Sequence, residues 1–248
     1  MPAVFVHGVP ETARLWDGVR RHLRRDDTIA LSLPGFGSPR PAGFGATKDD
    51  YADWLVAQLE RVVDDAGAPV DLVGHDWGGG FVVRVVSTRS DLVRTWVTDA
   101  AGLADPSFEW HDFAKLWQTP GDGEAFWEQQ LAASLEDRSA VFTMSGVPED
   151  EAKELAAHVD QTMAECILAL YRSATKVQDE WGPAFEAIDR RGLVVVPLGD
   201  PFLAVDGAQR AGARAGARVE TLDGKGHWWM LQDPGAAADL LTSFWGTA

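Results

Sequence analysis

The chain has 248 residues, 46% of them hydrophobic and 24% charged, which is typical of one soluble α/β domain with room for an inserted subdomain. Its formal net charge of −16 argues against nucleic acid and anionic membranes as partners, because both would repel so acidic a chain. A single cysteine, Cys166, and the lack of a signal-like or membrane-length apolar stretch predict a cytoplasmic protein.

The predicted elements alternate along the chain between apolar strands and amphipathic helices. Short apolar runs predict six strands, at 3–6, 28–33, 70–73, 95–98, 193–196 and 217–222. Apolar residues at helical spacing lie between them, at 14–23, 47–62, 80–86, 205–215 and 233–245. Thr47 is a good N-cap for the second of these helices. Apolar strands that alternate with helices predict a mostly parallel sheet covered on both faces.

From about residue 104 to residue 181 the strand pattern stops, and the sequence becomes helical, aromatic and acidic. We therefore predict an α/β core made of residues 1–103 and 182–248, with residues 104–181 inserted as a helical cap, or lid. Cys166 is expected to be a small buried residue on a helix of this lid. Eleven tryptophans are too many to expose without harming solubility, so many should be buried or line a pocket.

One turn carries the strongest chemical signal. It follows the predicted strand at 70–73 and reads Gly74-His75-Asp76-Trp77-Gly78, directly before a helix. Strand, sharp turn and helix form the setting of a nucleophile elbow, in which glycines let the backbone bend tightly. The central residue is Asp76 rather than serine. A carboxylate nucleophile forms an alkyl ester with a carbon electrophile, so the pattern predicts attack on carbon.

A nucleophile at an elbow needs a general base to complete turnover and an acid to orient that base. His227 follows the last predicted strand in a Gly-rich loop, and Asp200 follows the strand before it. Active residues of such sheets gather at the carboxyl ends of the strands, so Asp76, Asp200 and His227 are expected to meet there. Asp99 ends another strand and is an alternative orienting acid, or else a hydrogen-bond acceptor behind the site.

Five stretches together resemble the α/β-hydrolase superfamily, and within it the branch with an aspartate nucleophile: epoxide hydrolases, which are closest, and haloalkane or haloacid dehalogenases. These stretches are His7-Gly8-Val9-Pro10-Glu11, Pro34-Gly35-Phe36-Gly37, Gly74-His75-Asp76-Trp77-Gly78-Gly79, Asp200-Pro201-Phe202 and Gly226-His227-Trp228. The resemblance implies an α/β-hydrolase fold with about six strands, because two strands that usually precede the first motif are missing. The sheet edge left by their absence must be protected or paired, which makes it the expected place for a homodimer contact, if one forms.

The resemblance also implies a role for each residue of the motifs. Asp76 would attack carbon, and His227, held by Asp200, would activate the water that hydrolyses the ester. Backbone N–H groups of Val9 and Trp77 would form the oxyanion hole. The implied enzyme uses no cofactor and no metal.

An epoxide substrate needs an acid to protonate the leaving oxygen, and epoxide hydrolases usually use two lid tyrosines. Leu170-Tyr171-Arg172-Ser173 resembles the segment that carries one, so Tyr171 is the expected donor. Phe113 occupies the position that matches the second tyrosine, and Tyr51 lies on a core helix. The second hydrogen bond would therefore come from His111, Trp110 or Trp117.

Haloalkane dehalogenation with the same triad is the alternative, because the indole N–H of Trp77 suits a departing halide. Against it, the second donor in many dehalogenases is an asparagine at the position of Val9. A small haloacid is not expected. Fluoroacetate-type enzymes hold the substrate carboxylate with an arginine directly after the nucleophile, but Trp77 occupies that position here and Arg84 lies two helical turns further on. Lid aromatics predict a small apolar substrate in either case; they are Trp110, Phe113, Trp117, Phe126 and Trp127. A ligand-binding protein of low turnover on this fold is the alternative of another class.

Overall fold

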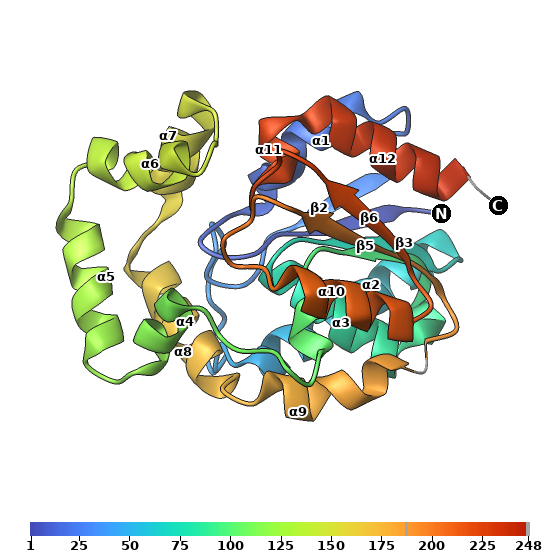
Figure 1. Cartoon of the computed structure of the whole chain (residues 1–248), viewed down its shortest axis with the longest axis horizontal. Coiled ribbons are helices and arrows are strands. Elements are labelled where there is room, and N and C mark those ends of the chain that lie inside the picture. Colours follow the sequence, from blue (N-terminus) through green and yellow to red (C-terminus); the bar gives the residue numbers. More distant parts are fainter. Residues whose placement is uncertain (187, 247–248) are drawn as a thin grey trace.

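The computed structural model describes residues 1–186 and 188–246, and its centre is one sheet of six parallel strands (Figure 1). The strands are β1 (Ala3–Val6), β2 (Thr28–Leu31), β3 (Val70–Gly74), β4 (Val93–Thr98), β5 (Arg191–Pro197) and β6 (Arg218–Leu222). Their order is β2-β1-β3-β4-β5-β6, and every neighbouring pair is parallel. The predicted six-stranded α/β architecture is therefore confirmed.

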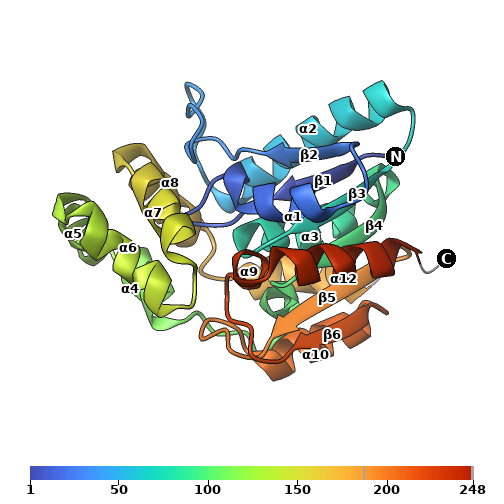
Figure 2. The ribbon, with the colours of Figure 1, turned by 90° about the horizontal axis from the view of Figure 1, so that it is seen from above.

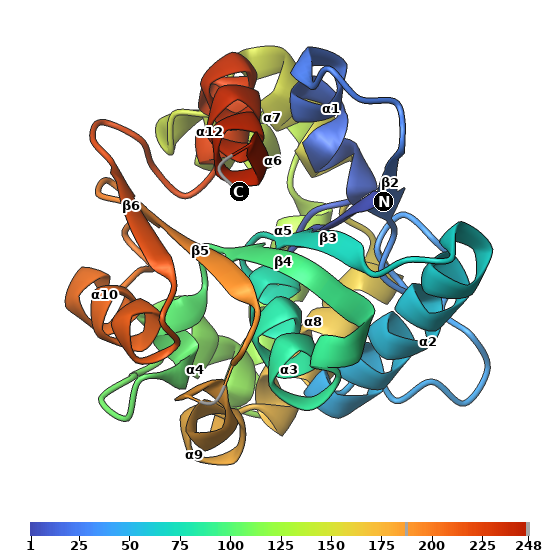
Figure 3. The ribbon, with the colours of Figure 1, turned by 90° about the vertical axis from the view of Figure 1, so that its right-hand side faces the viewer.

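Helices cover both faces of the sheet because successive strand side chains point to opposite sides. Phe5 and Val73 pack into one apolar cluster, whereas Val4 and Leu72 pack into the other. One face of the sheet carries α1, α11 and α12 (Figure 1), and the other carries α2, α3 and α10 (Figures 1 and 3). The bounds of these helices are α1 Asp17–His22, α2 Lys48–Ala66, α3 Trp77–Thr88, α10 Val205–Arg214, α11 Trp229–Gln232 and α12 Pro234–Gly246.

A set of helices leaves the α/β order between β4 and β5 and forms a separate layer beside the core (Figures 1 and 2). These are α4 (Asp112–Gln118), α5 (Asp122–Ala132), α6 (Leu135–Met144), α7 (Glu149–His158) and α8 (Gln161–Ser173). A short helix, α9 (Val177–Trp181), leads back to the core. The helical insertion has the predicted character, and Cys166 is fully buried on α8 as expected.

The lid lies at one end of the sheet. The N-terminus and the C-terminal end of α12 both lie at the other end (Figure 2). The strands begin near the N-terminus and run toward the lid, so their carboxyl ends face it. This arrangement places the loops after β1, β3, β4, β5 and β6 between core and lid, where α/β sheets bind their ligands.

The boundaries of the predicted elements lie within about four residues of those observed, and the sequence differs from the structure more deeply in two places. The helix predicted at 14–23 is split into a 3-10 turn, Ala13–Trp16, and α1, and Thr12 caps the turn by accepting from the Arg14 N–H. The four-residue helix α11 directly after His227 was missed because it is too short to show a period. Thr47 caps α2 through a reciprocal capping box with Asp50, as its position predicts.

Strand β2 forms one edge of the sheet, and a homodimer through this edge stays a prediction. Arg20 donates to the Thr28 carbonyl at 3.2 Å, so one edge acceptor is already occupied within the chain. Within the described residues, no helix has the length and apolar character needed to cross a membrane.

Candidate active site

The turn between β3 and α3 places Asp76 just beyond the carboxyl end of β3, in an unusual backbone conformation. Asp76 has φ 49° and ψ −122°, outside the regions that non-glycine residues normally adopt. The close crossing of the turn requires glycine at its flanks: a Cβ on Gly78 would lie 2.4 Å from the Val6 carbonyl oxygen. Strain of this kind is retained where the surrounding structure imposes it, and it is typical of functional sites.

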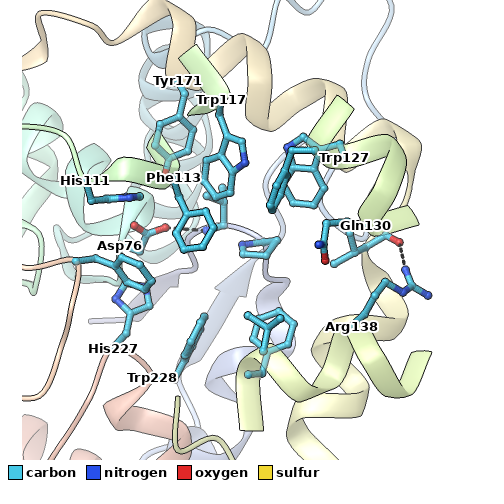
Figure 4. Close-up of a pocket in the computed structure, with 17 residues that line it drawn as sticks. Asp76, His111, Phe113, Trp117, Trp127, Gln130, Arg138, Tyr171, His227 and Trp228 are labelled. Carbon is cyan, nitrogen blue, oxygen red and sulfur yellow. Dashed lines mark hydrogen bonds between the residues drawn. The ribbon is translucent and has the colours of Figure 1, made fainter. Parts of the chain in front are cut away.

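The Asp76 carboxylate is held by one oxygen. Its Oδ2 accepts from the backbone N–H of Val9 at 2.8 Å (Figure 4, dashed). Burial raises the pKa of Asp76 to about 6, although the charges of His227 and His75 and the Val9 N–H act in the opposite direction. The Oδ1 atom makes no hydrogen bond with any residue that the structure describes, so it is the oxygen available to attack a substrate.

His227 lies beside Asp76 in the same cavity wall and is paired with Asp200. The distance from His227 Nδ1 to Asp200 Oδ2 is 2.8 Å, and the other Asp200 oxygen accepts from the Phe202 N–H at 2.8 Å. Burial lowers the pKa of His227, but the Asp200 carboxylate outweighs burial and raises the pKa above its usual value. The pair thus has the geometry expected of a base and its orienting acid.

Asp99 takes the position of a hydrogen-bond acceptor behind the site. Its Oδ1 accepts from the Asp76 N–H at 2.9 Å, and its Oδ2 lies 2.6 Å from His75 Nδ1. The indole of Trp229 also donates to Asp99 at 2.8 Å. Of the two acids considered from the sequence, the structure places Asp200 against His227 and Asp99 against His75.

A buried ionic cluster of Glu11, His75 and Asp99 lies directly beneath the elbow, and sequence reasoning missed it. His75 Nε2 is 3.2 Å from Glu11 Oε1, and both side chains are fully buried. Burial lowers the pKa of His75, but Asp99 and Glu11 together raise it well above its usual value, which favours the protonated imidazolium. The His75 and His227 ring centroids are 4.6 Å apart. A charge is therefore in contact with the base.

Glu11 also fixes the loop that carries Val9. One carboxylate oxygen accepts from the Gly8 N–H at 2.9 Å, and the other accepts from the indole of Trp228 at 2.5 Å. The only sequence signal for this role was a glutamate inside the first motif, since partners so far apart in the chain leave no periodic pattern.

Two lid side chains that can donate a hydrogen bond face Asp76. Tyr171 is buried, and both burial and the Asp76 charge raise its pKa well above 10, so its hydroxyl stays protonated. His111 Nδ1 accepts from the Ala114 N–H at 3.2 Å, which leaves the proton on Nε2. Burial lowers the pKa of His111 to about 4, so His111 is a neutral donor.

The other expected lid residues differ in how free their polar groups are. Trp117 is buried with an indole N–H that has no partner among the described residues, and its ring meets Tyr171 edge-on at 4.9 Å. Trp110 already donates its N–H to the Ala174 carbonyl at 3.0 Å, and its ring stacks on Trp77. Phe113 lines the cavity while 46% exposed, and it supplies apolar surface only.

Two cavities meet at Asp76 and His227. The larger one, which we call the lid cavity, lies between core and lid and is mostly apolar and aromatic (Figure 4). It is lined by Val9, Pro10, Asp76, His111, Phe113, Trp117, Phe126, Trp127, Gln130, Arg138, Val141, Phe142, Val159, Tyr171, Phe202, His227 and Trp228. The second cavity runs past Trp77 and Asp200. Gln130 and Arg138 were not expected from the sequence.

Glu11, His75 and His227 offer atoms within 4.8 Å of one another that could in principle bind a metal ion. Each of these side chains is already engaged in the contacts described above, with Trp228, Asp99 and Asp200 respectively. Two of the three, Glu11 and His75, belong to the ionic cluster beneath the elbow.

Comparisons with known proteins agree with this architecture. Residues 3–240 match the model of the alpha/beta hydrolase family. Among curated proteins, the AB hydrolase superfamily protein YfhM of Bacillus subtilis is 22% identical, and the alignment covers 97% of this chain and 88% of that protein. Lipase LipV of Mycobacterium tuberculosis is 33% identical over 41% of this chain and 36% of its own length. The chain thus spans only about a third of the lipase.

Dehalogenases stand among the similar proteins. A haloalkane dehalogenase of Agrobacterium fabrum is 29% identical over 60% of this chain and 50% of its own length. The structure of haloalkane dehalogenase DbeA from Bradyrhizobium elkani superposes with a TM-score of 0.74 at 21% identity, covering 100% of this chain and 92% of that one. E-2-(acetamidomethylene)succinate hydrolase gives a TM-score of 0.72 at 19% identity, covering 98% and 90%. These matches support the fold and do not single out epoxide hydrolases, which the sequence motifs favoured.

Proposed function

The chain belongs to the alpha/beta hydrolase family, and from that premise we propose that it hydrolyses a small apolar substrate at a saturated carbon through a covalent ester of Asp76. One observation carries the proposal: the residue at the elbow is a carboxylate that faces an apolar cavity beside the His227–Asp200 pair. A carboxylate in a dry cavity is poorly solvated and therefore a strong nucleophile toward carbon.

The first step forms the ester. Oδ1 of Asp76 attacks the electrophilic carbon from the side opposite the leaving group, whose bond breaks with both electrons. The Val9 N–H keeps Oδ2 fixed at 2.8 Å, so the attacking oxygen is oriented before the substrate arrives.

The second step hydrolyses the ester. Neutral His227 takes a proton from water, and the resulting hydroxide adds to the Asp76 carboxyl carbon. Oδ2 becomes the oxyanion and is stabilised by the Val9 N–H and by the N–H of Trp77, the first residue of α3. The tetrahedral intermediate then expels the alcohol oxygen, which takes the proton from His227. The carboxylic acid left on Asp76 releases its proton to solvent, which restores the carboxylate.

A halide is the first candidate for the leaving group. The Nε2–H of His111 is a neutral donor that faces Asp76. Trp117 also lines the lid cavity, and its indole N–H has no partner in the described part of the chain. The aromatic surface beside them suits an apolar haloalkane. Similarity to the named haloalkane dehalogenases also supports this candidate.

An epoxide is the second candidate, and one residue favours it. The protonated hydroxyl of Tyr171 lies in the lid cavity with Asp76 and can give its proton to the ring oxygen as the C–O bond breaks. Phe113 stands at the position of the expected second tyrosine and has no proton to donate. His111 would therefore supply the second hydrogen bond. The product would be a vicinal diol.

The test uses His227→Gln, which should leave attack intact and block ester hydrolysis. The variant is incubated separately with bromoalkanes and with terminal epoxides, and its intact mass is measured. A halide substrate adds the alkyl group less one proton, whereas an epoxide adds its whole mass. We expect an adduct on the peptide that contains Asp76, and we expect it to form faster with bromoalkanes than with epoxides.

Two variants control this experiment. Asp76→Asn combined with His227→Gln should give no adduct, because the nucleophile is removed. Tyr171→Phe should slow epoxide adducts about 100-fold or more if it is the acid, and should change bromoalkane adducts far less. A folded His227→Gln variant that gains no mass with either class would refute the covalent mechanism.

A further inference from the structure

The wall of the lid cavity that faces Asp76 carries two polar residues for which the proposed mechanism has no use. Gln130 lies on α5 and Arg138 on α6, and Figure 4 shows both across the cavity from Asp76. Both side chains are half-buried. Their neighbours in this wall are apolar, among them Trp127 and Val159.

Arg138 is the one lysine or arginine among the described residues that line this cavity. Its Nη1 donates to the Val159 carbonyl at 3.0 Å, which fixes the guanidinium against the end of α7. Within the described part of the chain, no carboxylate lies at ion-pair distance from Arg138, and its Nε is buried without a hydrogen-bond partner. In a chain of net charge −16, this cation is left without an acidic partner.

Gln130 has a free amide next to this charge. Its side chain makes no hydrogen bond with a residue that the structure describes, and in Figure 4 the amide faces the cavity. The indole N–H of Trp127 is also buried without a partner there. Donors left unpaired in an apolar wall are costly, and a ligand that brings an acceptor removes that cost.

We propose that Arg138 and Gln130 form a recognition site for the far end of the substrate, and that this end carries a carboxylate. The proposal rests on the function proposed above, because it concerns the same cavity, and it adds an anionic end group to the otherwise apolar substrate. The substrate would have an electrophilic carbon at one end, an apolar middle and an anionic oxygen group at the other, as in an ω-haloalkanoate. Guanidinium and amide groups are suited to hold a carboxylate through charge-assisted hydrogen bonds.

The charge of Asp76 sets the direction of binding. A carboxylate next to Asp76 would be repelled, whereas one at Arg138 is attracted across the apolar middle of the cavity. The two ends of the cavity thus select opposite ends of one molecule. A short haloacid, whose carboxylate sits next to the reacting carbon, would be disfavoured.

A binding experiment tests this site without requiring turnover. Octanoate and octan-1-ol are titrated into the protein, and binding is followed by fluorescence of the tryptophans that line the cavity. We expect octanoate to bind about tenfold more tightly than the alcohol, as one charge-assisted contact predicts. Arg138→Met should remove this preference and Arg138→Lys should keep most of it. Lys153→Met, which removes an exposed lid cation outside the cavity, should leave it unchanged.

Equal binding of acid and alcohol by the unaltered protein, or a preference that survives Arg138→Met, would overturn the proposal. Failure of octanoate to bind would overturn it as well. A second measurement compares ω-bromooctanoate with 1-bromooctane as alkylating agents of His227→Gln, where the acid should react at lower concentration and Gln130→Leu should narrow the difference. Absence of adducts together with a normal octanoate preference would count against the covalent function and not against this site.

Discussion

At the scale of single residues, the site combines a nucleophile whose pKa is raised with a base whose pKa is raised as well. Burial brings the pKa of Asp76 to about 6, and Asp200 raises that of His227. Esterification removes the Asp76 charge, which is one of the influences that raise the pKa of His227. Forming the ester therefore lowers the pKa of His227 and favours its neutral form, which can accept a proton from water.

The rate of adduct formation should depend on pH through Asp76. Only the carboxylate attacks, so adduct formation by His227→Gln should rise with pH and level off above the pKa of Asp76. That pKa is about 6 in the intact protein, and the loss of the His227 charge, which lowers it, should move the midpoint upward. Intact mass after timed quenching at different pH gives the profile. A rate that stays constant between about pH 5 and pH 8 would mean an ordinary aspartate, with a pKa of about 3.9.

The sequence predicted the proposed nucleophile, base and orienting acid more readily than the buried side chains that lie behind them. Asp76, Asp200 and His227 each follow a strand, and parallel strands bring such positions together, so their proximity was predictable. Glu11, His75 and Asp99 meet through side-chain rotamers and indole donors from distant segments. No spacing along the chain encodes those contacts.

At the scale of elements, the crossing of β3, α3 and β1 depends on a glycine. A Cβ on Gly78 would lie 2.4 Å from one backbone carbonyl oxygen and 2.6 Å from another, in β1 and the residue after it. A backbone carbonyl group cannot move aside as a flexible side chain can. The position of the elbow is therefore restrained by β1 as well as by β3.

Gly78→Ala should lower the free energy of unfolding by about 1–3 kcal/mol and also displace Asp76. For a chain of this length the loss corresponds to several degrees in the thermal midpoint, measured by circular dichroism. Gly102→Ala is the matched control, since its Cβ would meet nothing closer than 3.6 Å. A thermal midpoint for Gly78→Ala equal to that of the control would show that the crossing is looser than described.

The sequence predicted the extent of the lid but not how its helices are oriented. Composition predicted where the lid begins and ends and that it is helical. It did not predict which faces of α5 and α6 point toward the cavity. The apolar residues of these helices are spread around the helix axis and define no single buried face, and Val141 and Met144 on α6 are exposed. Gln130 and Arg138 could therefore not be assigned to the cavity before the helices were placed.

At the scale of the whole molecule, one buried carboxylate joins the start of the lid insertion to the core. Asp105, where the lid insertion begins, is 2% exposed and accepts from Arg210 and Arg214 on α10, with three contacts of 3.1 Å. Hydrogen bonds from Arg210 hold the pKa of Asp105 well below its usual range, against the effect of burial. This carboxylate stays charged in the folded protein at any ordinary pH.

Asp105→Asn should destabilise the protein by roughly 2–4 kcal/mol at neutral pH, because it leaves two arginines short of a partner. The folded pKa is depressed, so this contribution is present above the unfolded value of about 3.9 and is lost as pH falls toward the folded value. The gap in thermal midpoint between the unaltered protein and Asp105→Asn should thus narrow below about pH 4. Asp64→Asn, at an exposed position on α2, serves as control. A gap that stays constant with pH would contradict the ion-pair assignment.

The N-terminus and the C-terminal end of α12 lie on the side of the core away from the lid (Figure 2). A linker joined before β1 or after α12 would leave from the face opposite the cavity. Attachment to a solid support through either end would then hold every molecule with its cavity turned toward the flowing solution. A tethered preparation should keep its access to ligand, so both the binding and the alkylation measurements can be carried out on a surface.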